Sequence, residues 1–252
     1  MEEKVLSKAR LQELRKLHQK KFREERDYVL IEGLRLIHQL IDDGIKIVEL
    51  YTTEDFNALD DERLKRLKST PIYLINEVQK SQLSTTKAPQ NIFGLVKIPK
   101  MRELEGERLL YLDRISDPGN LGTIFRTSKA AGMDGIILSP ECCEVFNPKT
   151  IRASLGAVFS LPYTIENYKQ TMMRKAHFIV TDVAKGSSLY SIKKPPLPYI
   201  LVVGSEAAGV STEFKPQDQV RIKIPMVNGV ESLNVAVATS LCIYHLNRDI
   251  LG

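Results

Sequence analysis

Apolar positions in the first hundred residues follow helical and strand periodicities in turn. Leu11, Leu14 and Leu17 recur at helical spacing, and the pattern over 28–41 predicts a second amphipathic helix that Gly44 closes. Strands are predicted at 45–51, 72–75 and 92–98, and a charged helix over 55–68 lies between the first two. This order of elements predicts a small α/β unit.

The second part of the chain alternates short apolar runs with helical stretches. Strands are predicted at 109–113, 135–138, 177–182, 199–204 and 220–225, and helices at 121–131 and 233–251. Such alternation favours a mostly parallel sheet with helices on both faces. The apolar period breaks at the charged segment 99–106, which contains Pro99 and Gly106. We place a boundary there, between a domain at 1–100 and a domain at 107–252.

Composition and charge narrow the function classes only slightly. The 252 residues are 43% hydrophobic, and 36 Lys+Arg against 31 Asp+Glu give a net charge of +5, which permits a nucleic-acid partner without requiring one. No apolar run approaches the ~18 to 20 residues of a membrane helix, so we expect a cytoplasmic protein without a membrane partner. Cys142, Cys143 and Cys242 have no CxxC spacing, and neither a disulfide framework nor a metal site is predicted.

Three unusual loops follow predicted strands, at 113–122, 204–209 and 224–234. Loops beyond the carboxyl ends of strands are where open α/β sheets bind ligands. Each loop also has a purely structural interpretation. Asn120, Ser232 and Asn234 suit helix caps, Gly204 suits a turn, and Arg126 suits a surface position. Taken one loop at a time, both interpretations stay open.

Common phosphate and hydrolase motifs are missing from these loops. The segment GSEAAGV at 204–210 lacks the lysine of a P-loop, and no GxGxxG follows a strand. No GxSxG elbow surrounds Ser205, and the four histidines of the chain fall in helical or strand positions. These absences argue against nucleotide triphosphate binding, dinucleotide binding and serine hydrolysis.

Together the three loops resemble the motifs of the SpoU (TrmH) branch of the knotted SPOUT RNA methyltransferases. The matching segments are LDRISDPGNLGTIFRTSKAAGMDGIIL (112–138), LVVGSEAAGV (201–210) and IKIPMVNGVESLNVAVATSLCIY (222–244), and NPKTIRASLGAVFSLP (147–162) also looks like the family. The stretch 14–40, with KKFREERDYVLIEGLRLI at its centre, resembles the L30e-like RNA-binding domain that many members carry.

The resemblance implies an α/β fold with a trefoil knot in 107–252, and transfer of a methyl group from S-adenosylmethionine to a ribose 2′-hydroxyl of RNA. The cofactor would lie at Gly204, Ile224 and Leu233. The matching polar residues, which we take as the catalytic set, are Asn120, Arg126, Glu206, Ser232 and Asn234. Arg126 stands where the family places its proposed base. Because a guanidinium gives up a proton very reluctantly, a phosphate grip by Arg126 stays open as an alternative.

The resemblance also implies partners. Members act as homodimers through the knotted domain, so the apolar C-terminal helix is a candidate contact, with an ordinary core helix as the alternative. The basic residues predicted to lie along RNA are Lys16, Lys20, Lys21, Arg23 and Arg26. Members with this N-terminal domain often modify large-subunit rRNA, so we expect 23S rRNA as the substrate, with tRNA as the alternative.

Two other function classes compete with this prediction. A non-catalytic RNA-binding protein on the same fold would have lost at least one of the polar residues named above. A small-molecule enzyme on a generic α/β sheet leaves the separate basic N-terminal domain unexplained. A methyl-transfer assay with total RNA, combined with an RNA-binding test without cofactor, separates the three.

Overall fold

The structure is a computed structural model that describes residues 3–56, 61–67, 69–100, 103–193, 195–205, 208–214, 219–227 and 231–251. Its contacts divide the chain into two compact units. The N-terminal unit comprises Met1–Lys100 and Phe146–Ser160, and the C-terminal unit comprises Met101–Val145 and Leu161–Gly252. The segment 146–160 therefore packs with the first unit, although the sequence pattern groups it with the second.

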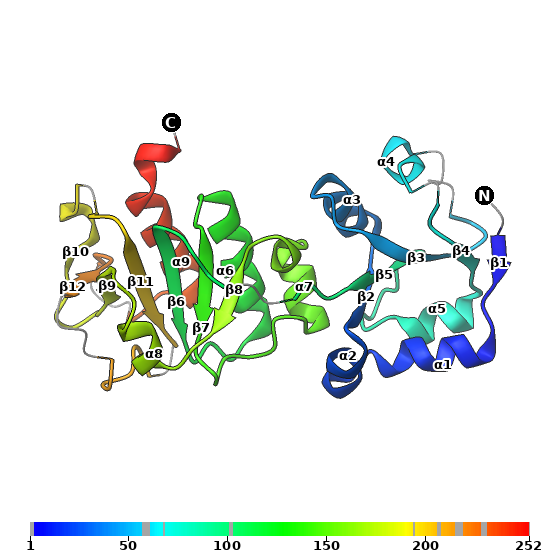
Figure 1. Ribbon diagram of the computed structural model, residues 1–252, viewed down its shortest axis with the longest axis horizontal. Helices are drawn as coiled ribbons and strands as arrows, with labels where there is room; N and C mark the ends of the chain where they lie inside the picture. The colour runs from blue at the N-terminus through cyan, green and yellow to red at the C-terminus, as the bar shows by residue number, and fades with distance from the viewer. Residues whose placement is uncertain are drawn as a thin grey trace. The chain divides into compact units, whose positions relative to one another are not determined.

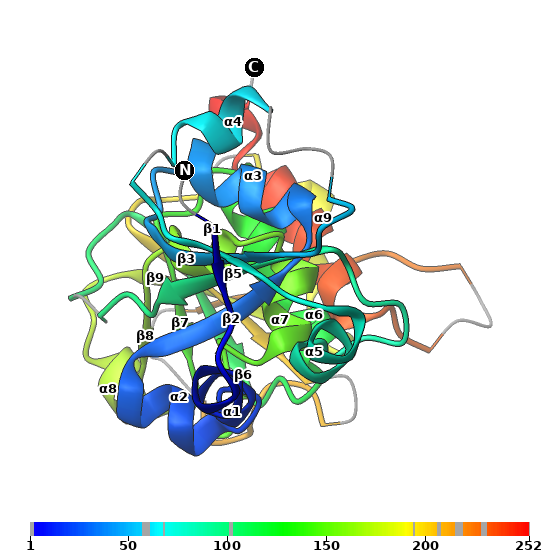
Figure 2. The same ribbon diagram turned by 90° about the vertical axis from the view of Figure 1, so that its right-hand side faces the viewer.

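The N-terminal unit contains a five-stranded sheet in the order β1-β4-β3-β5-β2. Its strands are β1 (Glu3–Val5), β2 (Tyr28–Glu32), β3 (Ile47–Thr52), β4 (Ile72–Leu74) and β5 (Ile92–Lys97). Its helices are α1 (Lys8–Lys16), α2 (Lys20–Arg26), α3 (Leu34–Asp42), α4 (Glu62–Lys65), α5 (Glu77–Leu83) and α7 (Pro148–Ser154), followed by the 3₁₀ turn η1 (Ala157–Phe159). Within this unit, α3 and α4 lie on one side of the sheet and α1 and α5 on the other (Figure 2).

The predicted helix over 28–41 is wrong in its first half. Tyr28–Glu32 forms strand β2, which pairs antiparallel with β5, and the helix begins only at Leu34. Val29, Leu30 and Ile31 are all buried, so the run has no polar face to reveal its period. A short apolar run of this kind fits a helix or a strand equally well, and the partner strand decides. Gly33, at φ +106°, separates the two elements.

The C-terminal unit contains a seven-stranded sheet in the order β10-β12-β9-β11-β6-β7-β8, and every pairing in it is parallel (Figure 1). The strands are β6 (Arg108–Asp113), β7 (Gly135–Leu138), β8 (Tyr163–Ile165), β9 (His177–Thr181), β10 (Ser187–Ser188), β11 (Tyr199–Gly204) and β12 (Gln219–Lys223). The predicted parallel α/β sheet is confirmed.

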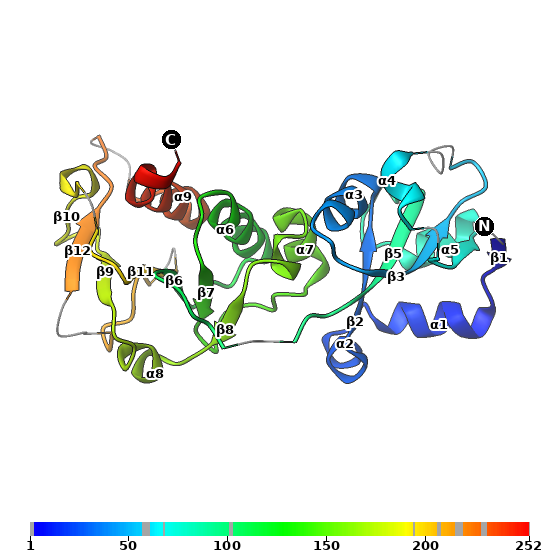
Figure 3. The same cartoon turned by 45° about the horizontal axis from the view of Figure 1, so that its top comes forward.

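Helices cover both faces of this sheet. They are α6 (Pro118–Ala130), α8 (Tyr168–Met172) and α9 (Val235–Leu246), with 3₁₀ turns η2 (Leu189–Ser191) and η3 (Arg248–Ile250). Helices α6 and α9 lie side by side on one face, and α8 lies on the other (Figures 1 and 3). Strands β6 and β11 are buried almost throughout, which is why they read as apolar runs. Among the described residues, no helix is both long and apolar enough to cross a membrane.

Candidate functional site

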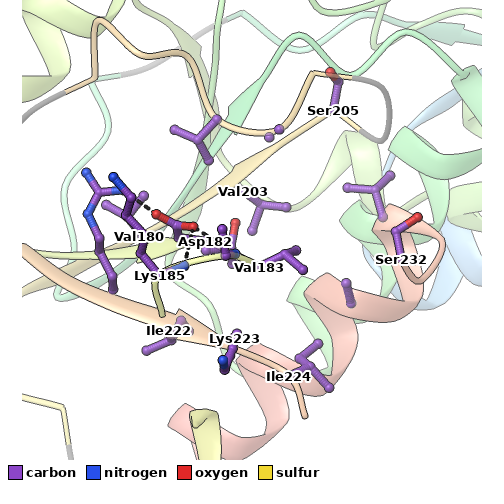
Figure 4. Close-up of a pocket in the computed structure, with 18 of the residues that line it drawn as sticks. Val180, Asp182, Val183, Lys185, Val203, Ser205, Ile222, Lys223, Ile224 and Ser232 are labelled. Atoms are coloured by element: carbon purple, nitrogen blue, oxygen red, sulfur yellow. Dashed lines mark hydrogen bonds and ion pairs between the residues drawn. The ribbon is translucent and has the colours of Figure 1, made fainter. Parts of the chain in front are cut away.

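A cavity of about 700 Å³ lies at the carboxyl ends of the neighbouring strands β11, β9 and β12 (Figure 4). Its walls come from the loop after β9, the loop after β11, the segment after β12 and the start of α9. Val180, Val203 and Ile222 give it apolar walls, and Lys185, Lys223 and Ser232 add polar groups to its lining. A volume of this size suits a cofactor-sized organic ligand.

Gly204, Ile224 and Leu233, the predicted cofactor residues, all line this cavity. They come from three different segments that only the folded sheet brings together. The largely apolar lining fits S-adenosylmethionine, which has an apolar purine face. These residues would hold the cofactor that the resemblance implies.

The loop after β11 explains why residue 204 is glycine. A Cβ built at Gly204 would stand 2.0 Å from the carbonyl carbon of Gly209 and 2.2 Å from the amide nitrogen of Val210. The loop returns across Gly204 because the Gly209 amide donates to the Ser205 carbonyl at 2.8 Å. The close approach that requires glycine is therefore an approach of the chain to itself, and it shapes one wall of the cavity.

The loop after β9 is a second wall, which the sequence analysis did not single out. The Asp182 carboxylate accepts hydrogen bonds from the amides of Ala184 and Lys185 and from Arg221, the last at 2.5 Å. These hydrogen bonds lower the pKa of Asp182, chiefly through the Lys185 amide. A Cβ at Gly186 would lie 2.3 Å from the carbonyl carbon of Ile222, so this turn fits tightly against β12. The signal that the sequence carried was an aspartate after a strand with a glycine four residues later.

Two predicted catalytic residues meet at the starts of α6 and α9. Asn234 is the N-cap of α9, accepting from the amides of Ala236 and Val237, and its side-chain amide donates to the Asn120 side-chain oxygen at 3.0 Å. Asp117, rather than Asn120, caps α6 by accepting from the Asn120 amide. Asn120 thus has its side chain available for the contact with Asn234, which joins two of the motif loops.

The other predicted catalytic residues are placed as follows. Ser232 is exposed and lines the cavity. Arg126 is exposed on α6 and is not part of the cavity lining, and its side chain pairs with none of the residues that the structure describes. Glu206 lies outside the described residues. The structure therefore brings Asn120 and Asn234 into contact and leaves the relation of Arg126 to the reacting groups as a prediction.

The predicted RNA-binding residues divide into two kinds. Lys16, Lys20, Lys21 and Arg26 are exposed on α1 and α2, although Lys20 and Lys21 pair with glutamates one turn along the helix. Arg23 is only 2% exposed and donates from Nη1 to the Leu17 carbonyl at 2.7 Å. Arg23 holds the turn between the two helices. The prediction that it lies along RNA is therefore wrong, because its side chain is buried. Among the described residues, no cluster of His, Cys, Asp and Glu has the arrangement of a metal site.

Comparisons with known proteins agree with this architecture. The model of the SpoU rRNA Methylase family matches residues 107–244, and that of the MRM3-like substrate binding domain matches 8–94. The 23S rRNA (guanosine(2553)-2′-O)-methyltransferase RlmP of Bacillus subtilis is 29% identical over 94% of this chain and 95% of its own. The human mitochondrial rRNA methyltransferase 3 is 26% identical over 92% of this chain and 70% of its own.

A solved structure extends the likeness to the whole fold. The crystal structure of an AdoMet-bound rRNA methyltransferase from Sinorhizobium meliloti is 30% identical, with a TM-score of 0.84 over 100% of this chain and 99% of that one. The family match covers more than half of the chain and contains all three motif loops. The chain belongs to the SpoU rRNA methylase family.

Proposed function

We propose that this protein is an S-adenosylmethionine-dependent enzyme that methylates a ribose 2′-hydroxyl of RNA. The observation that carries the proposal is the convergence of Gly204, Ile224 and Leu233 on one cavity. The family resemblance assigns these three residues to one cofactor, and a single binding site requires them to lie together. The named functions of the full-length relatives support the same activity.

Methyl transfer requires little covalent chemistry from the protein itself. S-adenosylmethionine supplies a sulfonium-bound methyl group, and transfer forms an O–C bond to the ribose, breaks the C–S bond and releases the hydroxyl proton. The chain must align these groups and control charge, which supply most of the rate in such reactions. We assign Arg126 to the proton or to the neighbouring phosphate. Glu206 and Asn120 would orient Arg126 and the ribose. Ser232 and Asn234 would shape the cofactor and substrate loops, and the contact of Asn234 with Asn120 joins two of these loops.

We propose large-subunit rRNA as the substrate, because a relative that spans nearly all of this chain is named for 23S rRNA. The test incubates the purified protein with radiolabelled S-adenosylmethionine and either 23S rRNA or bulk tRNA, and maps ribose methylation in cells with and without the gene. Methylation of tRNA alone would identify the second candidate substrate. RNA binding without methyl transfer would identify a non-catalytic RNA-binding protein and overturn the proposed activity.

We propose that the domain at 1–100 selects the RNA. Arg26 is exposed and borders a groove of about 350 Å³ that Tyr28 also lines. The rest of the lining is apolar, from Leu14, Leu17, Val48 and Leu95, and charged, from Arg10, Glu13 and Glu49. Rings beside guanidinium groups suit unstacked bases. Lys16 extends the positive charge along α1. Because η1 and α7 pack within this unit, its full core includes residues beyond 100.

Arg26→Ala is expected to weaken RNA binding and to reduce the slope of log affinity against log salt by about one, as expected for one lost phosphate contact. The measurement is a salt titration of RNA binding by fluorescence anisotropy. The matched control is Lys65→Ala, on α4 at the other side of the sheet, where the lysine pairs with Glu62 at 3.0 Å. Equal slopes in Arg26→Ala and the wild type would remove Arg26 from the RNA contacts.

We also propose a homodimer through α9. This helix buries one side in the C-terminal unit but leaves Val237, Leu241 and Tyr244 at 49%, 40% and 46% exposure. Positions 237, 241 and 244 fall on one helix face, so they form an apolar stripe that a second copy would cover.

A cytoplasmic location, expected from the sequence, suits an enzyme of this substrate class.

Leu241→Asp is expected to convert the dimer into a monomer, because two carboxylates would be buried across a two-fold contact. Light scattering coupled to size-exclusion chromatography measures the mass directly. Val78→Asp, which changes an apolar residue 65% exposed on α5, is the control and should leave the mass unchanged. A wild-type protein that is monomeric at micromolar concentration would contradict the proposed dimer.

A further inference from the structure

Arg114 connects the first motif loop to the loop that walls the cavity. It directly follows Asp113, the last residue of β6, and has a left-handed backbone at φ +58°. Few residues other than glycine and asparagine adopt this conformation readily. Its amide donates to the Ser139 hydroxyl at 3.0 Å, which fixes the turn. The hydrogen bonds of the Arg114 side chain would therefore have to offset the cost of this backbone conformation.

The side chain makes hydrogen bonds in two directions. Nε and Nη2 of Arg114 each donate at 3.1 Å to one oxygen of the Asp113 carboxylate, and Nη2 also donates to the Gly209 carbonyl at 3.2 Å. The Asp113 side chain is only 7% exposed and accepts from the Ser211 amide at 2.7 Å. The Asp113–Arg114 pair therefore holds the β11 loop at both Gly209 and Ser211.

This pair stands behind the cofactor wall without entering the cavity. Asp113 and Gly204 are register partners on β6 and β11, and the loop that crosses Gly204 is the one the pair holds. Gly209 and Ser211 line the cavity, whereas Asp113 and Arg114 do not. Any change in the pair reaches the cavity through the backbone of this loop. Glu206, one of the predicted catalytic residues, belongs to the same loop in sequence.

We propose that Arg114, together with Asp113, is a positioning residue that preorganises the β11 loop for S-adenosylmethionine. This inference rests on the proposed function for the identity of the ligand. A loop fixed before binding loses less conformational entropy when the ligand arrives, so the contribution appears as cofactor affinity. Turnover at saturating cofactor depends on the loop far less, because bound ligand itself holds the wall.

Arg114→Gly tests the proposal with little risk to folding, since glycine adopts the left-handed conformation freely. We expect the Kd of S-adenosylmethionine to rise about tenfold, the size of one lost charge-assisted hydrogen bond. The melting temperature should fall only slightly, because glycine relieves the left-handed backbone and so offsets part of the lost ion pair with Asp113. The KM for cofactor should rise by a similar factor while kcat changes less than twofold. Arg114→Lys should be intermediate, because one ammonium cannot bridge both partners in the same geometry.

The matched control is Arg174→Ala. Arg174 likewise donates from two of its nitrogens to one carboxylate, that of Glu166, and also donates to the Leu104 carbonyl, but it does not line the cavity. This variant should lower the melting temperature and leave cofactor affinity unchanged. If it weakens cofactor binding as much as Arg114→Gly does, the effect is general destabilisation and the positioning role is refuted.

Hydrogen exchange in the protein without cofactor gives a readout that does not depend on the ligand. The amides of Gly209 and Ser211, which donate to Ser205 and Asp113, should exchange faster in Arg114→Gly than in the wild type. Unchanged exchange at both amides overturns the positioning role. The role is also overturned if the wild type binds S-adenosylmethionine and Arg114→Gly binds it with the same affinity. A wild type that does not bind the cofactor overturns the proposed function instead, and the exchange result still decides whether Arg114 holds the loop.

Discussion

Arg126→Ala is expected to lower the rate of RNA methylation by on the order of a hundredfold or more, the usual cost of removing a general base or a charge-stabilising donor. The affinity for S-adenosylmethionine should barely change, because Arg126 is not part of the cavity lining. The fold should be unaffected, since the side chain is exposed and pairs with no described residue. Single-turnover kinetics at saturating RNA and cofactor, with calorimetry for cofactor binding, measure the two effects separately.

Two further variants define the role of Arg126. Lys129→Ala removes a positive charge from the same helix one turn along, and it should retain most of the activity. Arg126→Lys keeps the charge but loses the planar fork of the guanidinium. A largely active lysine variant would favour a phosphate grip, whereas a lysine variant as slow as the alanine variant would favour a geometry-dependent role in proton transfer. Near-normal turnover in Arg126→Ala would show that Arg126 has no catalytic role and is an ordinary surface arginine.

Gly204→Val is expected to abolish measurable binding of S-adenosylmethionine while the sheet stays folded. The added side chain would meet the backbone of Gly209 and Val210 at 2.0 to 2.2 Å, and backbone cannot move aside without displacing the loop. The loop after β11 is a wall of the cavity, so its displacement removes part of the binding surface. Calorimetry measures the binding, and circular dichroism with the melting temperature measures the fold.

Gly204→Ala sharpens this test, because even a single methyl group enters the occupied space. We expect a loss of cofactor affinity of on the order of tenfold or more, with a smaller loss for Ala208→Ser, which changes a cavity residue of the same loop without a backbone clash. Wild-type affinity in Gly204→Val would show that the β11 loop is not part of the cofactor site. Complete unfolding would instead show that this loop contributes to the stability of the sheet more than its exposure suggests.

Much of the C-terminal unit was predictable from the sequence. Parallel strands buried on both faces read as continuous apolar runs, and the runs at 109–113, 135–138 and 199–204 correspond to β6, β7 and β11. The N-terminal unit was less predictable. The centre of the run, at 29–31, contains no polar residue, and the pairing of 28–32 with β5, more than sixty residues away, made it a strand. The packing of segment 146–160 with the first unit has no local signal either.

The candidate site shows the same division. The glycines and short polar residues that mark the three loops are local features, so the sequence located the loops. The family resemblance then predicted which of their residues bind the cofactor. The contact of Asn120 with Asn234 spans 114 residues, and that of Arg114 with Gly209 spans 95. No periodicity or spacing contains such pairs. The loop after β9, with Asp182 at its centre, was overlooked for the same reason, because its role depends on β12 lying beside it.

By itself the sequence determined the α/β class, the order of most strands along the chain, the family and the loops that bear its motifs. The class and the strand order follow from local backbone preference and from the burial pattern of each segment, whereas the family follows from the resemblance of the motif segments. The tertiary structure alone decided which loops form a cavity, why residue 204 must be glycine, and that Arg23 holds a turn while Arg114 holds the loop after β11. Those properties depend on distances between segments far apart in the chain, which sheet order and packing fix and the linear pattern does not contain.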